Sequence, residues 1–89
     1  MISISNYQKL KNILLKNFKN MTVTVKTSGA VQTNTMINDT ELTFCKNKII
    51  VSNEDKDVTI DFLTLREINL DDEYRIKLKY DDFDLFIEL

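Results

Sequence analysis

The chain contains no histidine and no proline, and it has a single glycine and a single cysteine among its 89 residues. Histidine is the usual general acid or base near neutral pH and the commonest metal ligand. Glycine lets the backbone approach a phosphate group closely. Because these residues are missing or nearly missing, the sequence predicts a protein that is not an enzyme and that holds neither a metal ion nor a cofactor.

The lone cysteine, Cys45, has no partner for an intramolecular disulfide. Free cysteine side chains are commonly buried, so we expect Cys45 in the core; a reactive thiol beside Lys46 and Lys48 is the alternative. The longest aliphatic runs, 13–15 and 49–51, have three residues, whereas a helix that crosses a membrane needs about 20. With no secretory signal in the first residues, the sequence predicts a cytoplasmic protein that does not bind a membrane.

Charge is distributed unevenly along the chain, whose formal net charge is −2. Residues 1–44 carry a net charge of +3, and residues 45–89 carry a net charge of −5. Such asymmetry is typical of a surface that binds a charged partner, or of two halves that complement each other in the fold. The chain is also rich in Lys, Asn and Ile, which indicates an AT-rich coding genome, such as that of a low-GC bacterium or its phage.

Residues 5–19 have the pattern of an amphipathic helix. Apolar residues recur at helical spacing and form one stripe: Tyr7, Leu10, Ile13, Leu14 and Phe18. Four polar residues cluster on the opposite face: Lys9, Asn12, Lys16 and Lys19. The helix is therefore expected to pack on the rest of the domain with its basic face toward solvent.

After residue 20 the hydrophobic pattern changes to a period of two, which is typical of β-strands. We expect strands at 21–27, 30–37, 41–46, 48–53, 57–63, 74–80 and 83–89. Gly29 predicts a turn, and the capping-box spacing of Thr64 and Glu67 predicts one turn of helix. The predicted fold class is α+β: one domain in which the N-terminal helix packs on a curled antiparallel sheet or small open barrel of six to seven strands.

The C-terminal segment predicts a hairpin with a two-residue turn at Asp81 and Asp82, or alternatively a four-residue loop. The tight turn pairs the apolar residues on one face: Tyr80 with Phe83, Leu78 with Leu85, Ile76 with Ile87, and Tyr74 with Leu89. The other face pairs Lys79 with Asp84, Lys77 with Phe86, and Arg75 with Glu88. Because a shift by one residue would break every one of these pairs, their agreement supports the register.

Two acidic clusters lie at predicted turns of the C-terminal half. They are Asp71, Asp72 and Glu73, and Asp81, Asp82 and Asp84. Acidic residues at turns are often only solvated, but they can also form a recognition patch or, less often, hold a metal ion. We interpret both clusters as candidate partner-binding residues.

Phe86 is the one aromatic residue that the hairpin register turns away from the apolar face. Two interpretations follow. Either the N-terminal helix covers that face, which we favour, or Phe86 is an exposed anchor for a partner protein. The other seven aromatic residues, Tyr74 among them, lie on predicted apolar faces, and we expect them in the core.

These features favour a non-catalytic module that binds another protein. The acidic clusters would engage a basic surface on the partner, and Phe86 would supply an apolar anchor. Small cytosolic domains without catalytic residues are often used by phages and mobile elements as inhibitors. The sequence therefore suggests an inhibitor of a host nucleic-acid-processing enzyme of the CRISPR or restriction type.

Two other functions stay open. A small-barrel nucleic-acid-binding protein would use the basic helix face of Lys9, Asn12, Lys16 and Lys19. Nucleic acid is the less favoured partner, because the chain is acidic overall and has no arginine in its first 65 residues. A self-associating structural subunit would pair exposed strand edges. The sequence is compatible with a monomer or a homodimer.

Overall fold

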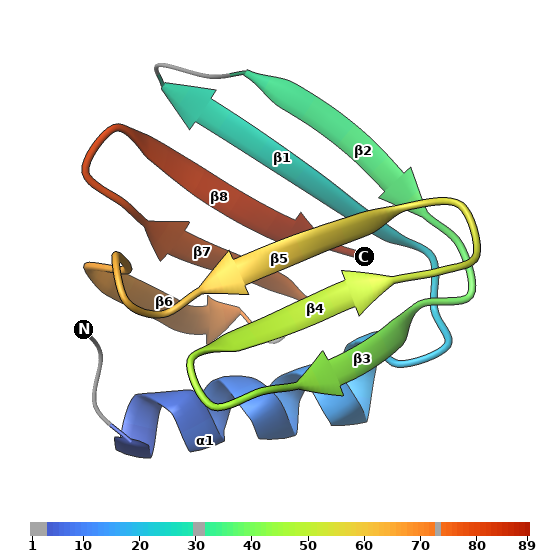
Figure 1. Ribbon diagram of the computed structural model, residues 1–89, viewed down its shortest axis with the longest axis horizontal. Coiled ribbons are helices and arrows are strands. Elements are labelled where there is room, and N and C mark those ends of the chain that lie inside the picture. The colour runs from blue at the N-terminus through green and yellow to red at the C-terminus, as the bar shows by residue number, and fades with distance from the viewer. Residues whose placement is uncertain (1–3, 30–31, 73) are drawn as a thin grey trace.

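The computed structural model describes residues 4–29, 32–72 and 74–89. In these parts of the chain one helix precedes eight strands (Figure 1). Helix α1 (Ile4–Ile13) continues directly into a π-helical turn, η1 (Leu14–Phe18). The strands are β1 (Val23–Gly29), β2 (Thr33–Ile37), β3 (Glu41–Phe44), β4 (Lys48–Ser52), β5 (Asp57–Asp61), β6 (Glu67–Asp72), β7 (Arg75–Lys79) and β8 (Phe83–Glu88).

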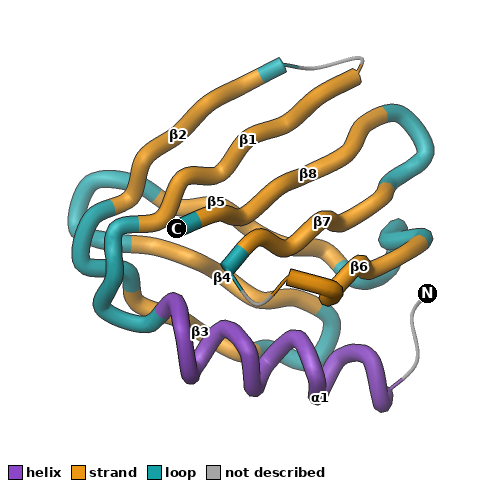
Figure 2. The backbone as a smooth tube through the Cα atoms, turned by 180° about the vertical axis from the view of Figure 1, so that it is seen from behind, coloured by secondary structure: helices purple, strands orange, loops and turns teal. Residues whose placement is uncertain are grey.

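The strands form two antiparallel sheets. The larger sheet has the order β2-β1-β8-β7-β6, and the smaller sheet has the order β3-β4-β5. In Figure 1 the smaller sheet lies in front of the larger one, with α1 along the side of β3; Figure 2 shows the same arrangement from behind. Across the described residues the sheets do not close into a barrel. The structure confirms the α+β class and has one strand more than the six to seven expected.

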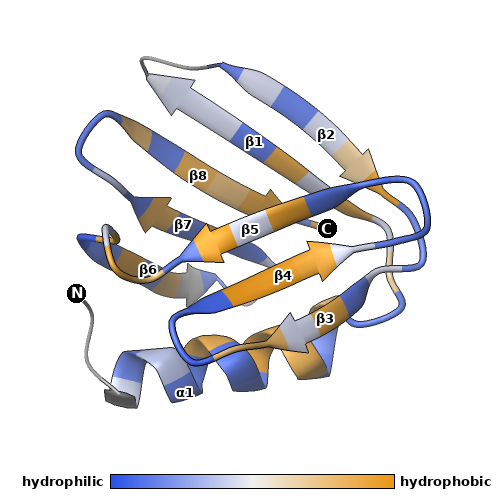
Figure 3. Cartoon of the chain, in the orientation of Figure 1, coloured by the Kyte–Doolittle hydropathy of each residue, from blue (hydrophilic) through white to orange (hydrophobic). Residues whose placement is uncertain are grey.

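The core lies between the two sheets and the helix, and the alternation of each strand explains which residues enter it. On the larger sheet the buried residues are Val23, Val25, Ile37, Ile76, Leu78, Leu85 and Ile87. The smaller sheet contributes Ile49, Val51 and Ile60, and the helix contributes Leu10, Leu14 and Phe18. The predicted apolar stripe of the helix is therefore confirmed. Figure 3 shows hydrophobic residues gathered on β4, β5, β8 and α1, whereas most loops are hydrophilic. The connection between β5 and β6 is an exception, because it contributes Phe62 and Leu65 to the core.

The helix ends in a wider turn than the regular α-helix that the sequence predicts. The N–H of Lys19 donates to the carbonyl oxygen of Leu14 at 3.1 Å, five residues back, which makes the last turn π-helical. Asn20 then takes a left-handed conformation with φ 64°, and its N–H donates to the carbonyl oxygen of Thr40 at 2.8 Å. The buried Thr40 hydroxyl donates to the carbonyl oxygen of Met21 at 2.8 Å. These bonds tie the end of the helix to the connection between β2 and β3.

Strand β6 occupies the place where the sequence predicts a turn of helix after Thr64. Glu67 begins this strand and lies opposite Lys79 of β7. Ile68 and Leu70 pack against the core from β6. The helical prediction is wrong because pairing with β7 satisfies the backbone of a whole strand, whereas a single helical turn is costly to form.

The hairpin of β7 and β8 has the predicted register. The N–H of Tyr80 donates to the carbonyl oxygen of Phe83 at 2.9 Å, so a two-residue turn joins the strands. At the open end, however, Tyr74 and Leu89 are 59% and 44% exposed. The prediction that Tyr74 lies in the core is therefore wrong, because it precedes β7 and lies beyond the part of the hairpin that the other elements cover.

The sequence predicts that Gly29 is part of a turn, but in the structure it is the last residue of β1. It has φ 136° and lies opposite Phe83 of β8. A Cβ atom at this position would lie 2.6 Å from the carbonyl oxygen of Asp82 and 2.9 Å from the Cα atom of Phe83. Glycine is required here because the two backbones approach so closely. Strand β2 begins at Thr33, and residues 30–31, which the sequence places at its start, lie outside the described residues.

Candidate binding surface on the five-stranded sheet

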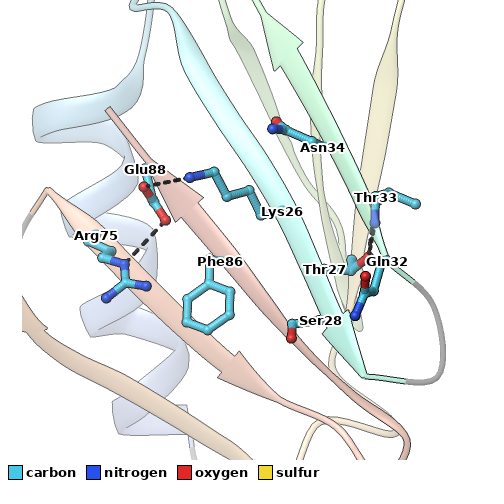
Figure 4. A pocket seen from close by; sticks show the side chains of 9 residues that line it. All are labelled: Lys26, Thr27, Ser28, Gln32, Thr33, Asn34, Arg75, Phe86 and Glu88. Carbon is cyan, nitrogen blue, oxygen red and sulfur yellow. Dashed lines mark hydrogen bonds and ion pairs between the residues drawn. The ribbon is translucent and has the colours of Figure 1, made fainter.

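The outer side of the larger sheet, opposite the core, carries a group of charged side chains around one aromatic ring (Figure 4). Pairing of β1, β8 and β7 puts Lys26, Phe86 and Lys77 in one row across the sheet. The neighbouring row includes Glu88 and Arg75. We call this surface the Phe86 face and define it by six residues: Lys26, Arg75, Lys77, Asp84, Phe86 and Glu88.

The Phe86 ring is half-buried by side chains of its own sheet. The Arg75 guanidinium carbon lies 4.7 Å from the ring centroid, and the Lys77 Nζ atom lies 5.9 Å from it. Both distances are within the range of cation–π attraction. Figure 4 shows the helix behind the strands that carry Phe86, so α1 does not cover this face. The favoured interpretation of Phe86 is therefore wrong, since the apolar stripe of α1 packs on the inner side of the sheet.

Two carboxylates pair with the three cations of the Phe86 face. The Glu88 side chain lies 3.2 Å from Nε of Arg75 and 3.5 Å from Nζ of Lys26. The Asp84 carboxylate lies 3.8 Å from Nζ of Lys77. The carboxylate side chains are 22% and 33% exposed, whereas the cationic side chains are 44–57% exposed. Among the six residues of the Phe86 face the cations are therefore more exposed than the carboxylates, and the exposed Asp72, opposite Arg75 in β6, adds a third carboxylate at the border of the face.

Open depressions lie on both sides of the Phe86 ring. The larger, of about 520 Å³, extends from Arg75 and Phe86 toward β2 and includes Ser28, Gln32 and Asn34 (Figure 4). A smaller one, of about 190 Å³, lies toward β6. Phe86 and Arg75 line both depressions. Their polar and open walls are suited to a segment of a macromolecule rather than to an enclosed small molecule.

The second acidic cluster is divided by the fold. Arg66 donates to both carboxylate oxygens of Asp81, from Nε at 2.7 Å and from Nη2 at 2.9 Å. This hydrogen-bonded pair lowers the pKa of Asp81 and raises the pKa of Arg66. Asp82 is exposed at the tip of the hairpin, and Asp84 belongs to the Phe86 face.

The first acidic cluster lies at the other end of β7. Asp72 is exposed at the end of β6, where its Oδ1 atom accepts the N–H of Tyr74 at 2.8 Å. Glu73 and the side chain of Asp71 lie outside the described residues. A five-residue strand separates the two clusters, which corresponds to roughly 13 Å or more. The structure therefore separates the two clusters along β7, although Asp72 lines the smaller depression beside Phe86 and so borders the Phe86 face.

A different acidic surface, which sequence reasoning missed, surrounds a depression of about 310 Å³ beside β3. Its acidic residues are Asp39, Glu41, Glu54 and Asp55. Two loops distant in sequence meet there, since the side-chain amide of Asn53 donates to the carbonyl oxygen of Asn38 at 3.0 Å. This contact and the pairing of Glu41 with Ser52 bring the four carboxylates together. Within the described ranges no group of three or more His, Cys, Asp or Glu is placed to hold a metal ion.

The remaining candidates lie away from the Phe86 face. The basic helix residues Lys9, Asn12, Lys16 and Lys19 are all exposed, as the helical pattern predicts. Cys45 is only half-buried, in a depression that also includes Lys46, Lys48 and Leu63, so the expectation of a core position is wrong. It follows β3 at the turn into β4, where the sheet no longer covers it. No helix among the described residues has the length and apolarity needed to cross a membrane.

Comparisons with known proteins do not assign this surface. No protein-family model, curated protein or solved structure matches the chain.

Proposed function

We propose that this protein is a non-catalytic binding module that contacts another protein through the Phe86 face. The observation that supports the proposal is an aromatic ring on the solvent side of β8, an interior strand of the larger sheet. Aromatic and arginine side chains are enriched in protein interfaces and supply many of the residues that dominate affinity. Phe86 and Arg75 are in contact here, and a depression lies on each side of the Phe86 ring.

The Phe86 ring is held in position before any partner binds. The guanidinium carbon of Arg75 lies 4.7 Å from the ring centroid, and the Nζ atom of Lys77 lies 5.9 Å from it. Strand β8 pairs with a strand on each side. Ordering a side chain on binding costs about 0.5–1.5 kcal/mol, so an anchor that is already ordered favours affinity. A partially buried ring on a paired strand is thus better suited to this role than the exposed Tyr74, which precedes β7.

The proposal keeps the protein partner expected from the sequence but changes the contact surface. The acidic clusters were the reason to expect a basic partner, and two of their members, Asp81 and Asp84, are engaged by Arg66 and Lys77. The inhibitor of a host nucleic-acid-processing enzyme is one form of such a module. Only the composition of the chain supports that finer role. Because the Phe86 face itself carries cations, it would have to contact a surface of that enzyme other than its basic nucleic-acid channel.

The proposal is tested by comparing Phe86→Ala with wild type in affinity capture from host lysate. We expect a stoichiometric protein partner that wild type retains and Phe86→Ala loses, with affinity reduced roughly thirtyfold for an anchor contributing about 2 kcal/mol. Leu63→Ala is the matched control, because Leu63 is an exposed apolar residue that lies between β5 and β6, outside the Phe86 face. Equal capture by wild type and Phe86→Ala, with both variants folded, would contradict the proposal.

A further inference from the structure

We infer that the segment recognised by the Phe86 face is acidic: a partner segment with carboxylate side chains next to an apolar one. This inference rests on the proposed function and reverses the charge of the partner expected from the sequence. It follows from three features of the surface, which are its exposed charge, the terminal donors of Arg75, which make no hydrogen bond to the described residues, and the polar depression beside β2.

Exposed charge is the first feature. In the depression between Phe86 and β2, two cations, Lys26 and Arg75, accompany one carboxylate, Glu88. The carboxylate of Asp72 lies on the other side of the ring, in the smaller depression. The Glu88 side chain is 22% exposed and lies between two cations, whereas the Arg75 side chain is 57% exposed. An approaching partner therefore meets the cations first, and an acidic segment gains from this field while a basic one is repelled.

Arg75 supplies the second feature. Its guanidinium has five N–H donors in a planar fork, which matches a carboxylate with two parallel hydrogen bonds. The hydrogen bond to Glu88 uses Nε, at 3.2 Å. The two terminal nitrogens are therefore positioned to receive a carboxylate from the partner without loss of the bond to Glu88. Lys26, whose Nζ atom is 3.5 Å from Glu88, adds a second positive charge on the β1 side of the ring.

The depression beside β2 is the third feature. Between Phe86 and β2 its wall contains the hydroxyl of Ser28 and the side-chain amides of Gln32 and Asn34 (Figure 4). Hydroxyl and amide groups both donate and accept hydrogen bonds, so they match the N–H and C=O groups of an extended peptide. An apolar side chain of that peptide would contact the part of the Phe86 ring that lines this depression and that Arg75 leaves uncovered, and its neighbouring carboxylate would reach Arg75.

A single-stranded nucleic acid fits the same surface less well. Such strands bind along a continuous basic groove and stack their bases on open aromatic rings. Here the Arg75 guanidinium already lies over the Phe86 ring at 4.7 Å, and the carboxylates of Asp84 and Glu88 interrupt the cations. An acidic peptide needs only isolated cations beside an apolar contact.

The test is an NMR titration of the isotope-labelled protein with three probes. These are the peptide Glu-Glu-Leu-Glu-Glu, its counterpart Lys-Lys-Leu-Lys-Lys, and a short oligothymidylate. We expect the acidic peptide to cause saturable shifts in the amide signals of β1, β7 and β8, and the lysine peptide to cause none. Affinity for the acidic peptide should fall as salt is raised.

Variants separate this inference from the proposed function. Arg75→Glu and the milder Arg75→Gln should weaken binding of the acidic peptide at least tenfold, whereas Lys9→Glu on the helix should leave it unchanged. Stronger binding of the lysine peptide or of oligothymidylate, or no shift on the Phe86 face with the acidic peptide, would overturn the inference. A protein partner that is lost with Phe86→Ala but binds Arg75→Glu more tightly would overturn it while keeping the proposed function.

Discussion

At the scale of single residues, close backbone contacts and buried polar groups make a few positions intolerant of change. Gly29 is one, because its φ of 136° and its approach to the hairpin turn exclude a side chain. Tyr80 is another, because its hydroxyl donates to the carbonyl oxygen of Asp61 at 3.0 Å and so joins the larger sheet to the smaller one. Each position leads to a prediction about stability.

We expect Gly29→Ala to lower the free energy of unfolding by roughly 1–3 kcal/mol, since the added Cβ atom would lie 2.6 Å from the carbonyl oxygen of Asp82. Backbone atoms cannot move aside as a flexible side chain can. Urea unfolding measures the effect, with Ser28→Ala at the neighbouring exposed position as the control. Equal stability of Gly29→Ala and wild type would show that β1 and β8 do not approach each other as described.

Tyr80 predicts how stability depends on pH in the alkaline range. Burial, and after it the charge of Asp61, raises the pKa of Tyr80 to about 12 from its ordinary value of 10.0. The unfolded chain therefore loses this proton first, so the contribution of Tyr80 is complete below pH 10.0 and is lost as the pH rises toward about 12. Tyr80→Phe should be about 1 kcal/mol less stable at neutral pH, through loss of one hydrogen bond.

Urea unfolding of both proteins at a series of pH values measures this difference. Tyr80→Phe should lose less stability than wild type between neutral pH and pH 12, because it has no phenol to ionise at this site. If the free energy of unfolding changed with pH in the same way for both proteins, the buried phenol of Tyr80 would not be the cause of the alkaline loss of stability.

At the scale of elements, the hairpin of β7 and β8 was predictable and β6 was not. In the hairpin, apolar pairs and charge pairs agree on one register, so two independent patterns point to the same structure. In β6 the alternation rests on Ile68 and Leu70 only, and the acidic residues that follow read equally well as a solvated turn. Its identity as a strand depends on β7, which supplies the hydrogen bonds.

Strand β2 is an edge strand of the larger sheet, and Lys56 covers part of the unpaired edge of β2. The Lys56 ammonium, from the loop between β4 and β5, donates to the carbonyl oxygen of Met36 at 2.8 Å. A charged group at an edge strand prevents pairing with another chain. We expect Lys56→Met to increase the fraction of dimer, measured by sedimentation velocity over a range of concentrations. Lys48→Met, on the exposed side of β4, is the control; identical behaviour of both variants and wild type would contradict this role.

At the scale of the whole molecule, the pairing of β1 with β8 brings the two halves of the chain together and creates the candidate surface. Lys26 comes from the basic half and Glu88 from the acidic half, 62 residues apart, and they meet only through this pairing. The uneven charge along the chain is thus partly complemented within the fold. The hairpin register correctly predicts that Phe86 faces outward, but no local pattern indicates that β1 lies beside it.

The helix likewise shows that a local pattern predicts an element but not its place in the fold. Its apolar stripe predicts that it packs on a sheet, and Leu10, Leu14 and Phe18 do so. Which side of the sheet it covers depends on the smaller sheet, which shares the core with it. The sequence therefore predicts the helix and leaves open whether Phe86 is covered, and the candidate surface follows from the tertiary arrangement alone.

The role of the Phe86 face is tested most directly by the affinity of the captured protein partner for wild type, Phe86→Ala and Leu63→Ala, each shown to be folded. We predict a loss of affinity of roughly thirtyfold for Phe86→Ala, as expected for an anchor of about 2 kcal/mol, and no change for Leu63→Ala. The same affinity for wild type and Phe86→Ala, or a loss confined to Leu63→Ala, would contradict the assignment of the Phe86 face as the contact surface.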